Sequence, residues 1–189
     1  MQATSEVSEI LKRLKRRKVG LIGIDGKDGS GKSTLARELA SRLGYIHVEL
    51  DDDEYVEKNL GQFVQNIKYD KVREKINNAQ NTLILDGVCL LAVFDRLHID
   101  PDLLIYVKRT GSYGEWRDEE ECDVSEDIEG FIARENEEYH RFGEAEAGIE
   151  GKKFDPDEWT LSELQKEIIR YHYDFRPHRK SDIIYNRGD

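Results

Sequence analysis

A short glycine-rich segment between two apolar patterns constrains the fold of this chain most strongly. Residues 19–24 read VGLIGI, a continuous apolar run that is typical of a strand covered on both faces. After the segment GKDGSGKST, leucines at 35, 39 and 43 follow one helical stripe, and Gly44 stands where a left-handed helix cap is favoured. The sequence therefore predicts a strand, a glycine loop and a helix in direct succession.

The loop fits the phosphate-binding pattern G-x-x-x-x-G-K-[ST], the P-loop. Backbone N–H groups in such a loop turn inward around phosphate oxygens, which requires glycine where a Cβ would clash, and the following helix adds partial positive charge. We expect Lys32 to reach the β- and γ-phosphates of a nucleoside triphosphate and Ser33 to offer its hydroxyl to Mg²⁺. The expected nucleotide-binding residues are Gly26, Lys27, Asp28, Gly29, Ser30, Gly31, Lys32, Ser33 and Thr34.

Apolar runs and helical patterns alternate along the rest of the chain. This alternation predicts an α/β fold of three layers, in which helices cover both faces of a mostly parallel, five-stranded sheet. Ligands of such sheets gather beyond the carboxyl ends of the strands, where Asp25, Asp52 and Asp86 fall. The strands expected after the first are 45–50, 82–86, 103–108 and 182–185, and the helices expected after the loop helix are 70–80, 125–142 and 160–173.

Three segments fall outside the alternation. Residues 111–130 are too acidic to pack into a core, so we expect a small lid or exposed connection there. The glycine-rich residues 143–156 are expected to separate two helices. The basic residues at 5–18 are expected to form a short helix whose cations lie near its negative carboxyl end. All of these segments fit one domain over residues 1–189, because a chain of this length can bury a single core.

Composition argues against several classes of protein. The chain has 29 basic and 40 acidic residues, a net charge of -11 that disfavours broad nucleic-acid binding. Cys89 and Cys122 lie far apart in no metal-ligand spacing, which favours reduced thiols in a cytoplasmic protein. No run approaches the roughly 18 apolar residues of a membrane span, and no signal-peptide pattern follows the basic residues 11–18. We expect a small-molecule partner and no membrane contact, and the sequence leaves open whether the chain forms a homo-oligomer.

Carboxylates after the second and third expected strands suit phosphoryl transfer. The segment ELDDDEYVEKN follows the second strand, and a carboxylate there can accept the proton of an attacking hydroxyl and help to hold the metal. We choose Asp52 for this role, with Asp51 and Asp53 as close alternatives. Asp86, in TLILDG, has the place of a Walker B carboxylate, which approaches Mg²⁺ directly or through water. At each site an aspartate that only caps a turn is the alternative.

Four motifs in this order resemble the uridine kinase-like family of P-loop kinases. They are GKDGSGKST, the D-x-x-Y from Asp52 to Tyr55, LILDGVCLL, and RPHRKSDIIYNRG, which is similar to the family's proline followed by A-D-I-I-x-x-R-G. The resemblance spans nearly the whole chain, and the combination of the first and last motifs is more specific than the first alone. It implies ATP as the donor, Asp52 as the base, and Ser33 and Asp86 at the metal.

The resemblance also implies residues around the acceptor. Tyr55 and Asp70 would face it, although Tyr55 could equally be a core aromatic and Asp70 an exposed helix cap. The family carries arginines in the lid that clamp phosphates at the transition state, whereas the lid of this chain is acidic. Arg117 is the best candidate here for such a clamp.

These observations together predict a kinase. We expect an ATP-dependent phosphotransferase that moves the γ-phosphoryl to a hydroxyl of a uridine-like nucleoside or another small molecule. GKDGSGKST also resembles the thymidylate kinases, but LDGVCLL lacks the Asp-Arg-Tyr that follows their third strand. The alternative from a different class is a nucleotide-dependent switch or ATPase without an acceptor, which the acidic lid and the basic N-terminal helix support.

Overall fold

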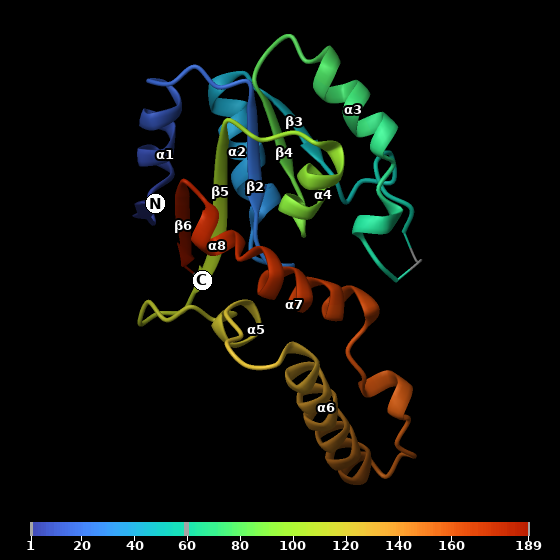
Figure 1. The fold of residues 1–189 in the computed structure, drawn as a ribbon. Helices are drawn as coiled ribbons and strands as arrows, with labels where there is room; N and C mark the ends of the chain where they lie inside the picture. The colour runs from blue at the N-terminus through green and yellow to red at the C-terminus, as the bar shows by residue number, and fades with distance from the viewer. Residues whose placement is uncertain (1, 59–60, 189) are drawn as a thin grey trace.

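The computed structural model describes residues 2–58 and 61–188, in which six parallel strands form one sheet between two layers of helices (Figure 1). The strands are β1 (Gln2–Thr4), β2 (Leu21–Asp25), β3 (Ile46–Glu49), β4 (Leu83–Asp86), β5 (Leu103–Thr110) and β6 (Ile183–Gly188). Their order in the sheet is β1-β6-β5-β2-β4-β3, and every neighbouring pair is parallel. The predicted α/β class is confirmed. The prediction of five strands is wrong, because β1 adds a sixth that is too short to show a periodic pattern.

Helices cover both faces of the sheet, as the alternation predicts. They are α1 (Val7–Leu14), α2 (Lys32–Leu43), α3 (Tyr69–Asn78), α4 (Leu90–Leu97), α5 (Glu119–Cys122), α6 (Ile128–Glu150), α7 (Glu163–Phe175) and α8 (Pro177–Lys180), with 3₁₀ turns η1 (Val64–Asn66) and η2 (Pro156–Trp159). On one face α1 and α2 pack against β2, β4, β5 and β6. On the other face α3, α4 and α7 pack against β2, β3 and β4. Among the described residues, no helix has the length and apolar character of a membrane span.

The central strand β2 contributes to both faces. Leu21 packs in the cluster with α4 and α7, whereas Ile22 and Ile24 pack in the cluster with α1 and α2. This division explains the continuous apolar run, because a strand covered on both faces has no solvated side. β2 pairs with β4 on one side and β5 on the other. Its carboxyl end, at Asp25, therefore lies near the middle of the row formed by the carboxyl ends of the strands.

Among the helices of eight or more residues, two differ most from the sequence prediction. The expected break at residues 143–156 is wrong over its first half, because α6 continues to Glu150. Gly143 stays helical and lets the ring of Trp159 pack directly against the helix backbone. No pattern predicted α4, whose apolar residues are buried against the sheet.

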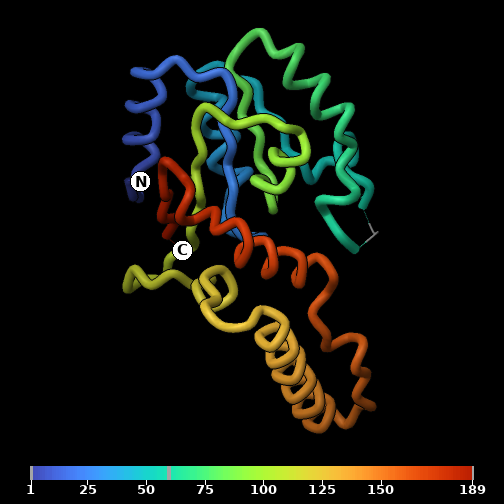
Figure 2. The backbone as a smooth tube through the Cα atoms, in the orientation of Figure 1, coloured from blue at the N-terminus to red at the C-terminus, as the bar shows by residue number. Residues whose placement is uncertain are grey.

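The acidic segment after β5 forms a separate layer below the sheet. The chain turns between Gly111 and Asp118, forms the single turn of α5, and continues into α6, which projects away from the sheet (Figure 1, Figure 2). α7 then returns between α6 and the carboxyl ends of the strands. A small apolar cluster joins α6 to α7, consisting of Val124, Phe131, Ile132, Leu161 and Ile169.

Gly23 in β2 is the position where one added methyl group is expected to disturb the core most directly. A Cβ there would lie 2.8 Å from Phe94 Cε2 and 2.9 Å from Leu104 Cδ1, so these buried side chains, or the helix and strand that carry them, would have to shift. Overpacking of this kind costs about 1–3 kcal/mol, and we expect Gly23→Ala to lower the melting temperature by about 2–10 °C. Gly148→Ala is the control, because a Cβ on this exposed glycine of α6 would meet no neighbouring atom of the described residues within 4 Å. A higher melting temperature for Gly23→Ala than for Gly148→Ala in thermal unfolding would contradict this packing.

Candidate functional site

The glycine loop lies at the carboxyl end of β2, where two neighbouring segments leave no room for side chains. A Cβ on Gly26 would lie 2.7 Å from the carbonyl oxygen of Val107 in β5. Gly31 has a φ of 95°, and a Cβ there would lie 2.7 Å from Cδ of Arg187 in β6. Both positions therefore require glycine, one because backbone lies against it and the other because of its left-handed conformation.

The start of α2 completes a cradle suited to an anion. The helix begins at Lys32 with Gly31 as its cap, so no side chain occupies the first N–H groups, and its first turn holds no acidic residue. Lys32 is only 4% exposed, and its ammonium donates to the carbonyl of Lys27 at 2.9 Å across the loop. Free N–H groups, a helix dipole and a buried cation converge here, which is the arrangement that binds phosphate.

A hydroxyl and a carboxylate meet beside this cradle. Ser33 Oγ donates to Asp86 Oδ2 at 2.6 Å, and the other oxygen of Asp86 lies 2.5 Å from Nε2 of His47 in β3. Asp86 is fully buried at the end of β4. These oxygen donors fit Mg²⁺, which binds one or two protein oxygens and takes its other ligands from phosphate and water. Within residues 2–58 and 61–188, no group of three or more His, Cys, Asp or Glu side chains could hold a metal.

Asp25 forms the buried base of the loop. It accepts from the N–H of Gly26 at 2.7 Å and from the hydroxyl of Tyr171 in α7. Burial raises the pKa of Asp25 from 3.8 to about 6, an effect that these two hydrogen bonds and the charge of Lys32 only partly offset. The loop is thus attached to α7 through a carboxylate that water does not reach.

The raised pKa of Asp25 predicts a pH-dependent cost to stability. Because the folded-state pKa lies above the unfolded value, folding is favoured most below pH 4, and that advantage is lost as the pH rises through about 6. Relative to wild type, the free energy of unfolding of Asp25→Asn is expected to rise by about 2 kcal/mol between pH 4 and pH 8. Urea unfolding of both proteins across this range measures the difference. A difference that does not change with pH would contradict the burial of an ionisable group here.

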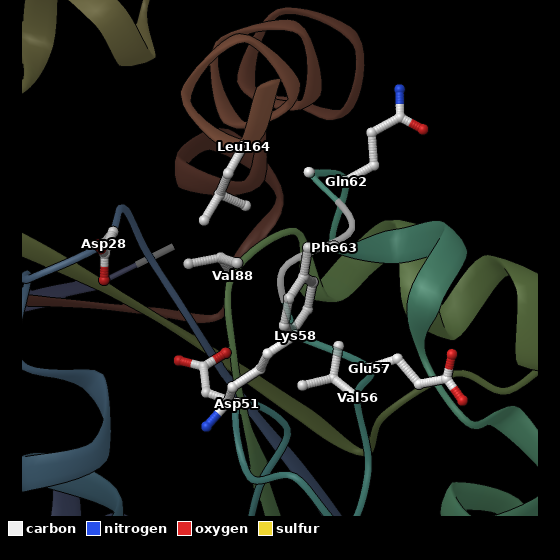
Figure 3. A pocket seen from close by; sticks show the side chains of 10 residues that line it. Asp28, Asp51, Val56, Glu57, Lys58, Gln62, Phe63, Val88 and Leu164 are labelled. Carbon is white, nitrogen blue, oxygen red and sulfur yellow. The ribbon is translucent and has the colours of Figure 1, made fainter. Parts of the chain in front are cut away.

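Beside the loop lies a cavity of about 350 Å³ (Figure 3). Its floor is apolar, and Phe63 and Val56 project into it, whereas the polar ends of Glu57 and Gln62 point away from its centre. The described lining residues are Asp28, Asp51, Val56, Glu57, Lys58, Gly61, Gln62, Phe63, Val88 and Leu164. Cavities of about 300–1,000 Å³ with an apolar lining and a few polar groups are typical small-molecule sites.

Of the three consecutive aspartates after β3, Asp51 is the one that joins the cavity to the loop. It lines the cavity and interacts electrostatically with Lys32, Asp86 and Asp28. Burial raises the pKa of Asp51, Lys32 partly offsets this effect, and the neighbouring carboxylates add to it. Asp52 is exposed and does not line the cavity, and Asp53 pairs with Lys58 at 2.9 Å. The geometry thus favours Asp51 over Asp52, the first choice from the sequence.

The predicted acceptor residues are not among the described lining residues of the cavity. Tyr55 is 5% exposed and packs in the apolar cluster with α3 and α4, which is the core position that the sequence left open. Asp70 is exposed in the first turn of α3.

Two other residues predicted for the site are also exposed. Arg117, the predicted phosphate clamp, is exposed beyond β5, where its backbone N–H donates to the carbonyl of Arg109. Thr34 is an exposed residue of the first helical turn.

The acidic segment after β5 forms ion pairs with the loop. Lys27 Nζ lies 2.6 Å from Glu121 and 3.7 Å from Asp118, and Asp118 also binds Arg109 at 2.7 Å. Asp118 is 4% exposed, so this pairing is partly shielded from water. Acidic groups at the base of the lid thus hold a lysine of the loop, in keeping with the acidic sequence of this segment.

Three residues near the loop or the cavity were not singled out in the sequence, and Asp25 was noted only for its place at the end of a strand. The three are His47, Glu167 and Tyr171, and each of these four residues acts through a partner distant in the sequence. Arg187 is a fifth, and its guanidinium lies over the loop, 3.4 Å from the carbonyl of Gly29. Arg187 belongs to the quoted segment RPHRKSDIIYNRG, so the final motif could have indicated it.

Comparison with solved structures agrees with this architecture. The chain is similar to the structure of a "Possible Uridine Kinase" from Bacillus stearothermophilus, with 13% sequence identity, a TM-score of 0.50, and coverage of 95% of this chain and 97% of that chain. It is also similar to deoxyadenosine kinase from M. mycoides with bound dATP, with 14% identity, a TM-score of 0.41, and coverage of 88% and 90%. No family model and no curated protein matches the sequence. The similarity to the first of these structures shows a shared fold, an α/β fold with a parallel sheet.

Proposed function

We propose that this chain is an ATP-dependent phosphotransferase that moves the γ-phosphoryl of ATP to a hydroxyl of a small, uncharged molecule such as a nucleoside. One observation carries the proposal: Asp51 lines the cavity and interacts electrostatically with the buried ammonium of Lys32. A phosphate cradle alone serves many proteins, but a carboxylate between a cradle and a cavity suits transfer to an acceptor.

In this proposal each group has a defined task. The loop N–H groups and Lys32 hold the β- and γ-phosphates, and Asp51 accepts the proton of the attacking hydroxyl. Ser33 and Asp86 would hold Mg²⁺, which when bound neutralises charge on the phosphates. Arg117 stays a proposal for a phosphate clamp that would act from the lid. Phe63 and Val56 would contact the apolar part of the acceptor.

The charge of the cavity favours a neutral acceptor over a monophosphate. Its described lining includes the carboxylates of Asp28 and Asp51, besides that of Glu57, which points away from the centre, and a single cation, Lys58, which pairs with Asp53. An anionic acceptor would be repelled there, because like charges in a partly buried site raise the free energy of binding. This point supports a nucleoside or other alcohol over the thymidylate kinase-like alternative.

A nucleotide-dependent switch is the second candidate, and one contact favours it. Glu121 at the base of the lid holds Lys27 of the loop at 2.6 Å, so the position of the lid can respond to occupancy of the loop. Such a protein would hydrolyse ATP slowly and would have no acceptor.

ADP release in the presence of Mg²⁺-ATP and a panel of nucleosides, other alcohols and nucleoside monophosphates tests the proposal. We expect ATP to raise the melting temperature, because a ligand that binds only the folded state stabilises it. At least one neutral member of the panel should raise ADP release by about 100-fold or more, because the cavity aligns its hydroxyl with the phosphate. The same slow rate with every compound would reject the kinase in favour of the switch.

A further inference from the structure

Helix α7 lies between the lid and the site, and one of its faces contacts both parts of the site. Leu164 lines the cavity, and Glu167, Tyr171 and Phe175 follow it at spacings of three and four residues. Residues at these spacings share one side of a helix. The cavity is seen below α7 in Figure 3, with Leu164 reaching down from the helix.

Glu167 fixes the wall of the cavity. Its carboxylate accepts from the N–H of Phe63 and from the N–H of Val64, the latter at 3.2 Å. The carbonyl of Val64 is held in turn by the hydroxyl of Tyr69 at 2.7 Å. A two-residue segment is thus held from both sides, and Phe63 within it projects into the cavity.

Tyr171 fixes the base of the loop one turn further along the same helix face. Its buried hydroxyl donates to Asp25 and accepts from the N–H of Leu91 at 3.1 Å. Asp25 accepts in turn from the N–H of Gly26, the first glycine of the loop. A chain of hydrogen bonds therefore runs from α7 into the segment that would hold phosphate.

We propose that α7 positions the two halves of the site separately: Glu167 sets the acceptor cavity through Phe63, and Tyr171 sets the phosphate loop through Asp25. This inference rests on the proposed function for its acceptor half. Neither residue touches a substrate, so both are positioning residues, and each should affect one ligand and not the other.

The two variants should therefore have opposite kinetic signatures. Glu167→Ala frees Phe63, so we expect the KM for the acceptor to rise by about 10-fold while kcat and the Kd for ATP stay within about threefold, because the two charge-assisted hydrogen bonds are lost only at the cavity. Glu167→Gln keeps one carbonyl acceptor and should lie between wild type and Glu167→Ala. Tyr171→Phe should raise the Kd for ATP by about 10-fold and leave the acceptor KM within about threefold.

Matched controls lie on the same helix. Asp174→Asn removes an exposed carboxylate, and Tyr173→Phe removes a hydroxyl from a ring that faces Arg176 and the small cluster under the lid. Both should leave the two ligand constants within about twofold, because neither side chain reaches the loop or the cavity. Calorimetric titration with a non-hydrolysable ATP analogue gives the Kd without turnover, and thermal unfolding confirms that each variant is folded.

A second readout separates this inference from the proposed function. Amide hydrogen exchange at residues 63–64 should be faster in Glu167→Ala than in Glu167→Gln, even if no acceptor of the panel is phosphorylated. In that case the kinase proposal fails while the positioning role of α7 is supported. Equal changes of both ligand constants in both variants, or exchange at 63–64 unchanged by Glu167→Ala, would overturn the inference.

Discussion

Replacement of Asp51 by asparagine is expected to lower kcat for phosphoryl transfer by about 10³-fold, within the range that general bases contribute. Asparagine keeps the shape of the side chain but cannot take the proton of the acceptor hydroxyl. Affinity for ATP should change by less than about threefold, because the loop N–H groups and Lys32 supply the phosphate contacts. Single-turnover kinetics with saturating ATP and acceptor measure the loss.

Asp52→Asn is the matched control for this prediction. Asp52 is exposed and does not line the cavity, so its variant should retain at least about half of the wild-type rate, as exposed substitutions usually do. The opposite ranking, with Asp52→Asn inactive and Asp51→Asn active, would restore the choice made from the sequence and reject the arrangement after β3.

Replacement of Lys32 by methionine is expected to weaken ATP binding by about 100-fold and to lower transfer by about 10³-fold or more, because the cation that neutralises the phosphates is removed. Methionine preserves the length of the buried side chain, and removing a buried charge should not unfold the protein. Calorimetric titration of ATP gives the first value, and ADP release gives the second.

Lys71→Met provides the comparison for Lys32→Met. Lys71 is an exposed residue of α3, so its loss removes one positive charge without touching the loop. ATP affinity of this variant should match wild type within about twofold, because exposed charges at a distance are screened by salt. Wild-type affinity in Lys32→Met would show that the nucleotide binds elsewhere.

Local sequence patterns were sufficient to predict the loop and its neighbouring strands. The apolar run at 19–24 became β2 at Leu21–Asp25, and 82–86 became β4 at Leu83–Asp86. Such segments are predictable because glycine positions and continuous apolar runs reflect constraints within a few residues. The parallel sheet followed from the alternation of these segments with helices.

The choice among three adjacent aspartates was not predictable in the same way. Which of them faces the loop depends on the turn after β3. In this turn the backbone N–H of Asp52 donates to the carbonyl of Glu49, and the backbone N–H of Leu50 donates to the carbonyl of Asp86. Leu50 is buried by this turn, which leaves Asp51 directed toward the cavity. The spacing of a motif predicts which segment carries the carboxylate of the site. The backbone conformation of the turn decides which of the adjacent carboxylates points into the site.

Contacts between distant parts of the chain account for the remaining omissions. Tyr171 lies 146 residues from Asp25, and Glu167 lies 104 residues from Phe63. In the sequence both residues look like ordinary members of an amphipathic helix, and only the packing of α7 across the strand ends gives them a role. The length of α6 was missed because its glycines suggested a break, whereas Gly143 accommodates the ring of Trp159.

The fate of the γ-phosphoryl tests the central claim most directly. Incubation with ATP labelled with ³²P at the γ position, Mg²⁺ and the acceptor panel should place the label on a hydroxyl of one neutral compound, and Asp51→Asn should abolish that product. Label found only in inorganic phosphate, at a rate that no acceptor changes, would contradict the account.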